Sequence, residues 1–438
     1  MTPRSPRATS TASVRPKPRV GDLFGSLRMP VFWLLVGLLL VGTARLGEMV
    51  APALARYPVA TTTAFVVFGL YAVPFVIFIV NLDHLEREPP VLLATAFTWG
   101  AVVVTATAVP GNVAADSLVA KFVSPRFAAM WGPALAGPTI EETLKFLGVL
   151  AIALLASAQV NSVVDGMVYG AMVGLGYQVM ENVSYAAIAV QAAGAGDRIE
   201  PVFSTFIVRG VLAGPWSHTV FTALAGAGVG YAVVRVDRSP AARVGFAGLC
   251  LGGAWLCHFG WNSPLLADGF GLGTPGQIAA LLIKGGPVLG LALMLAHMAR
   301  VREGDYYANV LSTLADPRIV TPAELRAFSS LGGRAALRRA AYARTGAAGD
   351  RAARHLQEAQ ARLAVELSRG PAADGGLTPA SAARARDVLR ARHDLAALAL
   401  GPAGSRRPFA GSTVMWLIGV WVTVFGALGL ALMLRALT

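Results

Sequence analysis

Long apolar segments recur along most of this chain, with short polar stretches between them. A membrane-spanning helix needs about 20 mainly apolar residues. Nine segments reach that length, at 29–49, 58–82, 91–110, 131–157, 164–190, 204–234, 244–266, 276–299 and 412–436. The pattern therefore predicts an all-α fold, a polytopic transmembrane helical bundle of about nine spans.

Two polar segments lie outside these spans. Residues 1–28 are rich in Pro, Ser and Arg and have no apolar period, which is typical of a flexible tail. Residues 300–411 have a helical pattern, in which Thr321 and Glu324 form a capping sequence and Gly370 ends a helix over 350–367. We expect four parts: a flexible basic cytoplasmic tail (1–28), an eight-span membrane core (29–299), a small Arg-rich cytoplasmic helical domain (300–411) and a C-terminal transmembrane helix (412–436).

The composition agrees with a membrane protein. Of the 438 residues, 55% are hydrophobic and 14% are charged, whereas an ordinary soluble chain is about 25% charged. One soluble core cannot take in that much apolar surface, so a soluble enzyme is disfavoured and a disordered chain is excluded. Cys250 and Cys257 would lie about 10 Å apart on one helix, too far for a disulfide, and no Cys-rich zinc site is expected.

The positive charge lies at the ends of the bundle. The chain carries a net +13, with +5 in residues 1–28 and +8 in residues 300–407, whereas residues 29–299 carry −1 and Arg435 adds the last +1. This distribution argues against nucleic-acid binding and for the positive-inside rule. Loop 235–243 carries three arginines and loop 267–275 has no basic residue, while loop 83–90, at net −2, is the exception. We expect an integral membrane protein with a cytoplasmic N-terminus.

Several predicted spans contain ionisable or amide side chains, each of which is costly inside a bilayer. They are Glu141, Glu142, Lys145, Glu181, Asn182, Arg209, His218, His258 and Asn262, with Asp165 near the inner end of its span. Glu141 and Lys145 share a helix face and should pair, whereas Glu142 points about 100° away. Two adjacent carboxylates at low dielectric do not both ionise easily, a condition that suits a general base acting on water.

The same residues admit other interpretations. Polar side chains inside a membrane also connect helices without any chemistry, and proton-coupled transporters use them as readily as enzymes. A proton-coupled transporter or a non-catalytic membrane scaffold therefore stays open as the alternative to an enzyme. Transporters usually contain internal repeats, and no convincing repeat relates the two halves of this chain.

Four ordered motifs resemble those of the PrsW-type intramembrane proteases, distant relatives of the CAAX-prenyl and bacteriocin-processing membrane proteases. The motifs are GPTIEETLKFLGV at 137–149, DGMVYGAMVGLGYQVMENVSY at 165–185, SHTVFTALAGAGVGYA at 217–232 and HFGWN at 258–262. The loop DHLEREPP at 83–90 resembles a short acidic Glu-Pro element of the same family. The resemblance covers roughly residues 58–299 and leaves out the tail, residues 300–411 and the last span.

The resemblance implies a membrane-embedded endopeptidase, that is, a peptide hydrolase. Its catalytic residues would be Glu141, Glu142, His218, His258 and Asn262, supported by Lys145, Glu181, Asn182 and Arg209. Glu141 would deprotonate a water oriented with His218, while His258 and Asn262 would stabilise the oxyanion. A metal-free glutamate mechanism and a zinc mechanism both stay open; for zinc the ligands would come from Glu142, Glu181, His218 and His258.

The resemblance also implies the setting of the reaction. The substrates would be membrane proteins or peptides, such as anti-sigma factors or other single-span regulators cut in a site-1-type step. The protein would lie in the lipid bilayer of a prokaryotic plasma membrane. No nucleic-acid partner is expected, and no pattern indicates an oligomeric state.

Overall fold

The structure is a computed structural model that describes residues 27–83, 85, 87–370 and 376–399. Within these residues every regular element is a helix, so the predicted all-α class is confirmed. The helices of the membrane core are α2 (Pro30–Arg56), α3 (Pro58–Val80), α4 (Pro90–Thr98), α5 (Thr105–Phe122), α6 (Pro125–Leu155), α7 (Val163–Ala193), α8 (Glu200–Thr205), α9 (His218–Val234), α10 (Pro240–Asn262) and α11 (Gly273–Ser312). Two π-helical segments, η1 (Trp99–Val104) and η2 (Phe206–Leu212), and two short 3₁₀ turns, η3 (Gly214–Trp216) and η4 (Gly269–Gly271), interrupt or join them.

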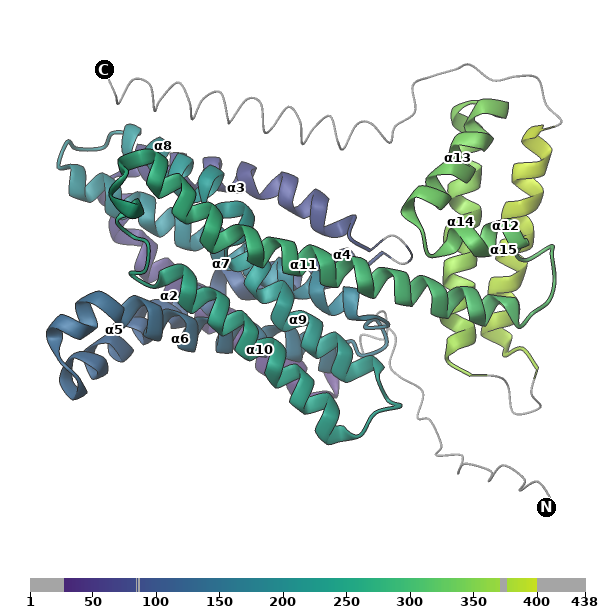
Figure 1. Cartoon of the computed structure of the whole chain (residues 1–438), viewed down its shortest axis with the longest axis horizontal. Coiled ribbons are helices and arrows are strands. Elements are labelled where there is room, and N and C mark those ends of the chain that lie inside the picture. The colour runs from purple at the N-terminus through teal and green to yellow at the C-terminus, as the bar shows by residue number, and fades with distance from the viewer. Residues whose placement is uncertain (1–26, 84, 86, 371–375, 400–438) are drawn as a thin grey trace.

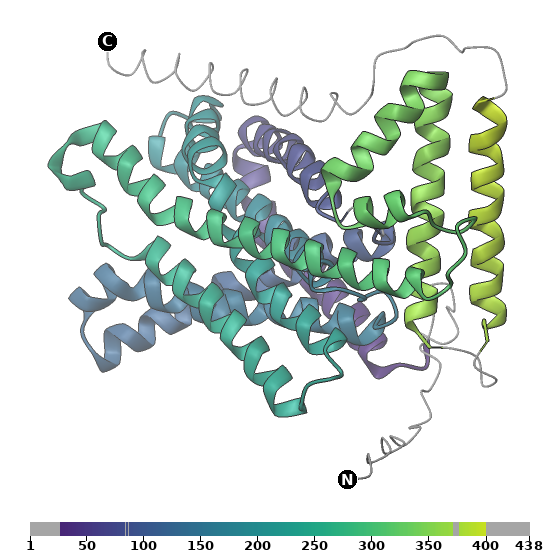
Figure 2. The ribbon, with the colours of Figure 1, turned by 45° about the vertical axis from the view of Figure 1, so that its right-hand side comes forward.

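The core is a bundle in which the chain passes back and forth eight times (Figures 1 and 2). One pass is the continuous run α4–η1–α5, and another is the broken run α8–η2–η3–α9. The α9–α10 loop lies at the same end of the bundle as the polar helical domain, whereas the α5–α6 and α10–α11 turns lie at the opposite end (Figure 1). The arginines of loop 235–243 and the basic helical domain therefore share one side, as the charge pattern requires.

Among the described residues, six helical runs are long and apolar enough to cross a membrane: Pro30–Arg56, Pro58–Val80, Pro90–Phe122, Glu200–Val234, Pro240–Asn262 and Gly273–Ser312. Six of the nine predicted spans are recovered in this way, and the one at 412–436 lies outside the described residues. The predicted spans 131–157 and 164–190 form α6 and α7, which are not among the six. Both helices contain charged and polar groups. Helix α7 is buried along most of its length and does not need the apolar surface of a lipid-facing helix, whereas α6 buries its charged residues and keeps exposed apolar side chains such as Leu147 and Leu154.

Helix α7 is buried along most of its length and packs most closely on α9. A Cβ at Gly170 would lie 2.2 Å from the Thr222 carbonyl oxygen, and one at Gly226 would lie 2.1 Å from the Gly166 carbonyl oxygen. The glycines of α7, Gly166 and Gly170, therefore let the two backbones touch. This contact sets the position of α9, which carries His218 at its first residue.

The polar helical domain contains α12 (Pro322–Phe328), α13 (Leu331–Thr345), α14 (Ala347–Ser368) and α15 (Pro379–Ala399). The capping box between Thr321 and Glu324 is present, and α14 contains the predicted helix 350–367. Helix α11 runs through residue 300, where the sequence suggested a boundary, and contributes Tyr307 and Leu311 to the apolar core of the domain. The membrane core and the domain are thus joined by one continuous helix.

Candidate active site

Four ionisable residues from three helices meet inside the bundle. Glu141 and Glu142 lie on α6, His218 begins α9 and His258 lies on α10. Each offers one ligand-type atom, and these atoms all lie within 4.8 Å of one another. All four side chains are buried. The four side chains therefore converge on a common point, as an active site requires, and do not form separate contacts between helices.

The ammonium of Lys145 lies at the centre of this group. Its Nζ is 2.7 Å from Glu142 Oε1, 3.4 Å from Glu141 Oε2 and 3.1 Å from His218 Nδ1. The predicted pair between Glu141 and Lys145 is present, but Glu142 makes the shorter contact. Lys145 is fully buried and lies 4.5 Å from the centroid of the Tyr177 ring. A lysine ammonium has three donors, so these three contacts account for all of them.

The hydrogen-bond partners define how each histidine is protonated. Asn262 Nδ2 is 3.1 Å from His258 Nε2, and His258 Nδ1 is 2.9 Å from Glu142 Oε1. Since an amide nitrogen can only donate, Nε2 accepts and Nδ1–H donates to Glu142. His218 has the opposite arrangement, because Nδ1 accepts from Lys145 and Nε2–H donates to Glu181 Oε2 at 2.9 Å. Both rings are neutral in this network and have different tautomers.

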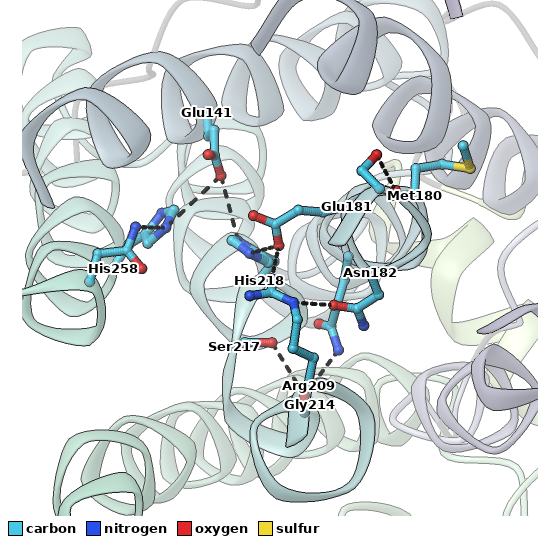
Figure 3. Close-up of polar contacts among 12 residues, drawn as sticks. Glu141, Met180, Glu181, Asn182, Arg209, Gly214, Ser217, His218 and His258 are labelled. Atoms are coloured by element: carbon cyan, nitrogen blue, oxygen red, sulfur yellow. Dashed lines mark hydrogen bonds and ion pairs between the residues drawn. The ribbon is translucent and has the colours of Figure 1, made fainter. Parts of the chain in front are cut away.

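Glu181, Arg209 and Asn182 extend the network on the far side of His218 (Figure 3). Arg209 donates to Glu181 Oε2 at 2.5 Å and to Asn182 Oδ1 at 2.9 Å. Glu181 thus receives hydrogen bonds from both Arg209 and His218, which fixes the orientation of the imidazole. Arg209 is carried by the π-helical segment η2, and π segments inside helices occur frequently at functional sites.

All nine residues that the sequence nominated therefore belong to one connected network. Asn262 joins the network through its contact with His258. On the other side, His218 contacts Glu181, Glu181 contacts Arg209, and Arg209 contacts Asn182. Asn262 also donates to the Pro133 carbonyl at 3.1 Å, so both hydrogens of its amide have acceptors. The predicted oxyanion role of Asn262 would require one of these two bonds to be exchanged for substrate.

The structure adds two residues that the sequence reasoning did not assign to the site. Asn112 on α5 donates from Nδ2 to Glu141 Oε1 at 3.0 Å. Gln178 on α7 accepts at Oε1 from the Thr219 backbone N–H at 3.3 Å and from its hydroxyl at 2.9 Å. Gln178 thereby caps the start of α9, next to His218. Polar residues in apolar helices are the signal that marks both positions.

The donor atoms of the buried group fit a zinc-type ion, since two carboxylates and two imidazoles are ligands that zinc uses. Glu142 Oε2 is buried and has no hydrogen-bond partner in the described part of the chain, so one carboxylate oxygen is available to a cation. The group contains Glu141 and not the predicted ligand Glu181, which accepts hydrogen bonds from Arg209 and His218. Asp165 lies in a separate buried group with Asp83 and Glu88, away from this one as its position in the sequence suggested.

The arrangement provides the parts of a hydrolytic centre. Glu141 has one oxygen held by Asn112, while its other oxygen lies 3.8 Å from His218 Nδ1 and 3.9 Å from His258 Nε2. A carboxylate between two imidazoles can accept a proton from water, and the nearby ammonium and amide donors can stabilise developing negative charge. Figure 3 shows Glu141, His258 and His218 directed toward a common space.

Comparison with known proteins agrees with this chemistry. Residues 88–292 match the model of the PrsW family intramembrane metalloprotease, a range that runs from the end of loop 83–90 into α11 and contains every residue of the network. No curated protein and no solved structure matches the chain. Residues 88–292, which form most of the membrane core, are therefore similar to the PrsW family of intramembrane metalloproteases.

Proposed function

We propose that this membrane protease hydrolyses a peptide bond of a membrane-bound protein, within or beside the bilayer, with Glu141 as the general base. The family assignment makes the chain a membrane protease. The observation that supports the role of Glu141 is its position, with Oε2 facing His218 Nδ1, His258 Nε2 and Lys145 Nζ at 3.4–3.9 Å.

The proposed reaction begins with water beside Glu141 and His218. Glu141 takes one proton as the water oxygen attacks the scissile carbonyl carbon, and the carbonyl oxygen becomes an oxyanion. Glu141 then gives the proton to the leaving nitrogen while the C–N bond breaks, and a carboxylic acid and an amine result. One carboxylate thus serves as base and then as acid, and no redox partner is needed.

The oxyanion needs hydrogen-bond donors that are already in place. Asn262 is a half-buried member of the network, and its bond to the Pro133 carbonyl is one that a substrate oxygen could replace. The Lys145 ammonium adds positive charge within the same group. Together they supply the electrostatic stabilisation that the reaction requires.

Glu142, His218 and His258 would hold a zinc ion in this family of metalloproteases. When bound, such an ion polarises a carbonyl oxygen or lowers the pKa of a bound water. The residues of the chain have the same roles with or without the ion: Glu141 transfers the proton, and Glu181 orients His218 through the hydrogen bond from Nε2.

We further propose a prokaryotic plasma membrane location with the N-terminus in the cytoplasm, and single-span regulators such as anti-sigma factors as substrates. The arginines of loop 235–243 and the basic helical domain support this orientation, since both lie at one end of the bundle (Figure 1). Cysteine labelling from outside intact cells should then reach loop 267–275 and not loop 235–243.

The test is cleavage by the purified full-length protein in liposomes. A panel of single-span membrane proteins, anti-sigma factors among them, is incubated with the wild type, with Glu141→Gln and with Glu48→Gln. Glu48 is an exposed glutamate paired with Arg45 on α2 and is the matched control. We expect a fragment from the wild type and from Glu48→Gln, and none from Glu141→Gln. Unchanged cleavage by Glu141→Gln would show that another group is the base.

A further inference from the structure

The Lys145 side chain contacts the groups that a metal ion would need. Its ammonium lies within 3.4 Å of atoms from three of the four candidate ligands, Glu141, Glu142 and His218. The fourth, His258, donates to the same Glu142 oxygen that receives the ammonium. The centre of the ligand group is thus a position where one cation is already held.

This cation is carried by the same helix as its two carboxylate partners. Lys145 follows Glu142 by three residues and Glu141 by four, and residues at these spacings are neighbours on a helix surface. Lys145 is fully buried, with the Tyr177 ring on one side and His218 on another. A long side chain in this position cannot reach water by a small rotation, so its charge stays close to the ligand group.

A divalent ion bound to the same atoms would lie a few ångströms from the ammonium. Like charges at such a distance inside a protein repel strongly, because little solvent screens them. Glu142 could offer the ion its free oxygen, Oε2, but His218 Nδ1 would have to give up its hydrogen bond from Lys145. Metal binding therefore competes directly with the internal ion pair.

We propose that Lys145 is the resident cation of this site and that it competes with a divalent metal ion for Glu141, Glu142 and His218. The inference concerns the site on which the proposed function rests, but it is a statement about metal affinity and not about proteolysis. The ammonium of Lys145 compensates one of the two negative charges of the buried carboxylates. It also predicts that loss of the ammonium strengthens metal binding.

The experiment measures metal affinity in the full-length protein in detergent. Zn²⁺ alone is titrated with unfolding temperature and bound-zinc content as readouts, and Co²⁺ alone is titrated with its visible absorption spectrum, which reports ligand geometry. The variants are Lys145→Met and Lys145→Gln, which remove the charge, and Lys145→Arg, which keeps it. Lys284→Met is the matched control, because Lys284 is a half-buried lysine in α11 that donates to the Trp261 and Ser263 carbonyls.

We expect both neutral variants to bind Zn²⁺ and Co²⁺ more tightly than the wild type, by a factor of at least about ten. Lys145→Arg and Lys284→Met should bind as the wild type does. Equal affinity in the wild type and the neutral variants overturns the proposal, as does weaker binding or no binding by the neutral variants. If Lys145→Met does not fold, Lys145→Gln keeps a donor for Glu142 and decides the question. Proteolysis is assayed separately, so a protein that cleaves nothing leaves this result interpretable.

Discussion

Asn112 and the two histidines contact different oxygens of the Glu141 carboxylate. Asn112 Nδ2 holds Oε1 at 3.0 Å, which leaves Oε2 to face His218 and His258. The amide nitrogen must face the carboxylate, because the opposite orientation would place two acceptors together. The asparagine thus fixes the direction in which Glu141 presents its proton-accepting oxygen.

Replacing Asn112 by alanine should lower kcat while KM stays close to the wild-type value. A hydrogen bond to a charged group contributes about 1.5–3 kcal/mol, so the expected loss in kcat is about tenfold to a hundredfold. Steady-state cleavage of one substrate by Asn112→Ala gives both constants. Asn81→Ala is the control, because the Asn81 side chain donates to the Ile77 carbonyl at the end of α3, outside the active-site network. A normal kcat for Asn112→Ala would mean that the contact has no part in positioning Glu141.

The sequence could predict the charged residues of the site more easily than the neutral ones. Glu141, Lys145 and His258 interrupt apolar spans and are costly unless they meet partners, so their grouping could be anticipated. Asn112 lies just past the predicted end of a span at residue 110, whereas the helix continues to Phe122 with Pro110 inside it. Neutral amides near a soft helix boundary resemble loop residues, and only the packing of α5 on α6 shows where Asn112 points.

Among the helices, the contact between α7 and α9 controls the position of His218. A Cβ at Gly174 would lie 2.3 Å from the His218 carbonyl oxygen, closer than any real contact. Gln178, one turn further along α7, caps the start of α9 through Thr219. Helix α7 therefore places the imidazole by backbone contact at one position and by hydrogen bonding at the next.

Gly174→Ala should push α9 away from α7 and displace His218. Overpacking of this kind costs about 1–3 kcal/mol in stability, and we expect a lower unfolding temperature together with loss of most cleavage activity. Gly252→Ala on α10 is the matched control, because a Cβ there would meet nothing within 4 Å. That variant should retain activity and unfold at the same temperature or slightly higher, since alanine favours helix over glycine. Normal activity in Gly174→Ala would mean that the two helices can separate without moving the imidazole.

Which helices could be predicted from the sequence depends on how much of each helix is exposed. Apolar length alone located eight helical passes through the core, because every exposed face must match lipid. A stricter requirement, a long apolar stretch with few charged residues, does not recognise α6 and α7 as spans, because both helices contain charged and polar groups that pack inside the bundle. The π-helical segments η1 and η2 have no sequence signature in this chain; they arise where Gly100 and Arg209 are fitted against α7 and its side chains.

At the scale of the whole molecule, the polar helical domain has its own charged centre at Glu324. Arg392 of α15 donates to both carboxylate oxygens, at 3.1 and 2.6 Å, and Gln360 of α14 donates to Oε2 at 3.0 Å. Burial raises the pKa of the Glu324 carboxyl, but the hydrogen bonds from Arg392 and from the Thr321 backbone N–H outweigh it and hold the pKa below its usual value. One glutamate thus ties three helices of the domain together.

The stability that Glu324 contributes should depend on pH in a defined direction. A lowered folded-state pKa stabilises the fold fully above the unfolded-state value of about 4.3, and the effect is lost as the pH falls through the lower folded value. The unfolding temperatures of the wild type and Glu324→Gln should therefore differ at pH 7 and converge below about pH 4. Asp305→Asn, at an exposed position of α11, is the control and should follow the wild type throughout. A difference between wild type and Glu324→Gln that persists at low pH would contradict the ionic origin of the effect.

Leu85 connects the helical domain to the membrane core. It lies in the loop between α3 and α4, yet its side chain is buried in the apolar core of the domain with Tyr307, Leu311 and Phe328. The same loop carries Glu88, which accepts a hydrogen bond from the Tyr169 hydroxyl of α7. A short segment thus contacts the core of the domain at one residue and the central helix of the bundle at another, so the two parts are packed as one unit.

Leu85→Ala should loosen this packing without reaching the active site. Truncation of a buried leucine lowers the free energy of unfolding by about 2–5 kcal/mol. The helical domain should lose this stability, because Leu85 packs in its core. Hydrogen exchange should therefore speed up in α12 and α14, while amides of α7 and α9 keep their protection. Leu389→Ala on the outer face of α15 is the matched control and should change little. Faster exchange in α7 as well would mean that the loop transmits the change through Glu88 and Tyr169, whereas no change in either part would show that Leu85 does not hold the domain in place.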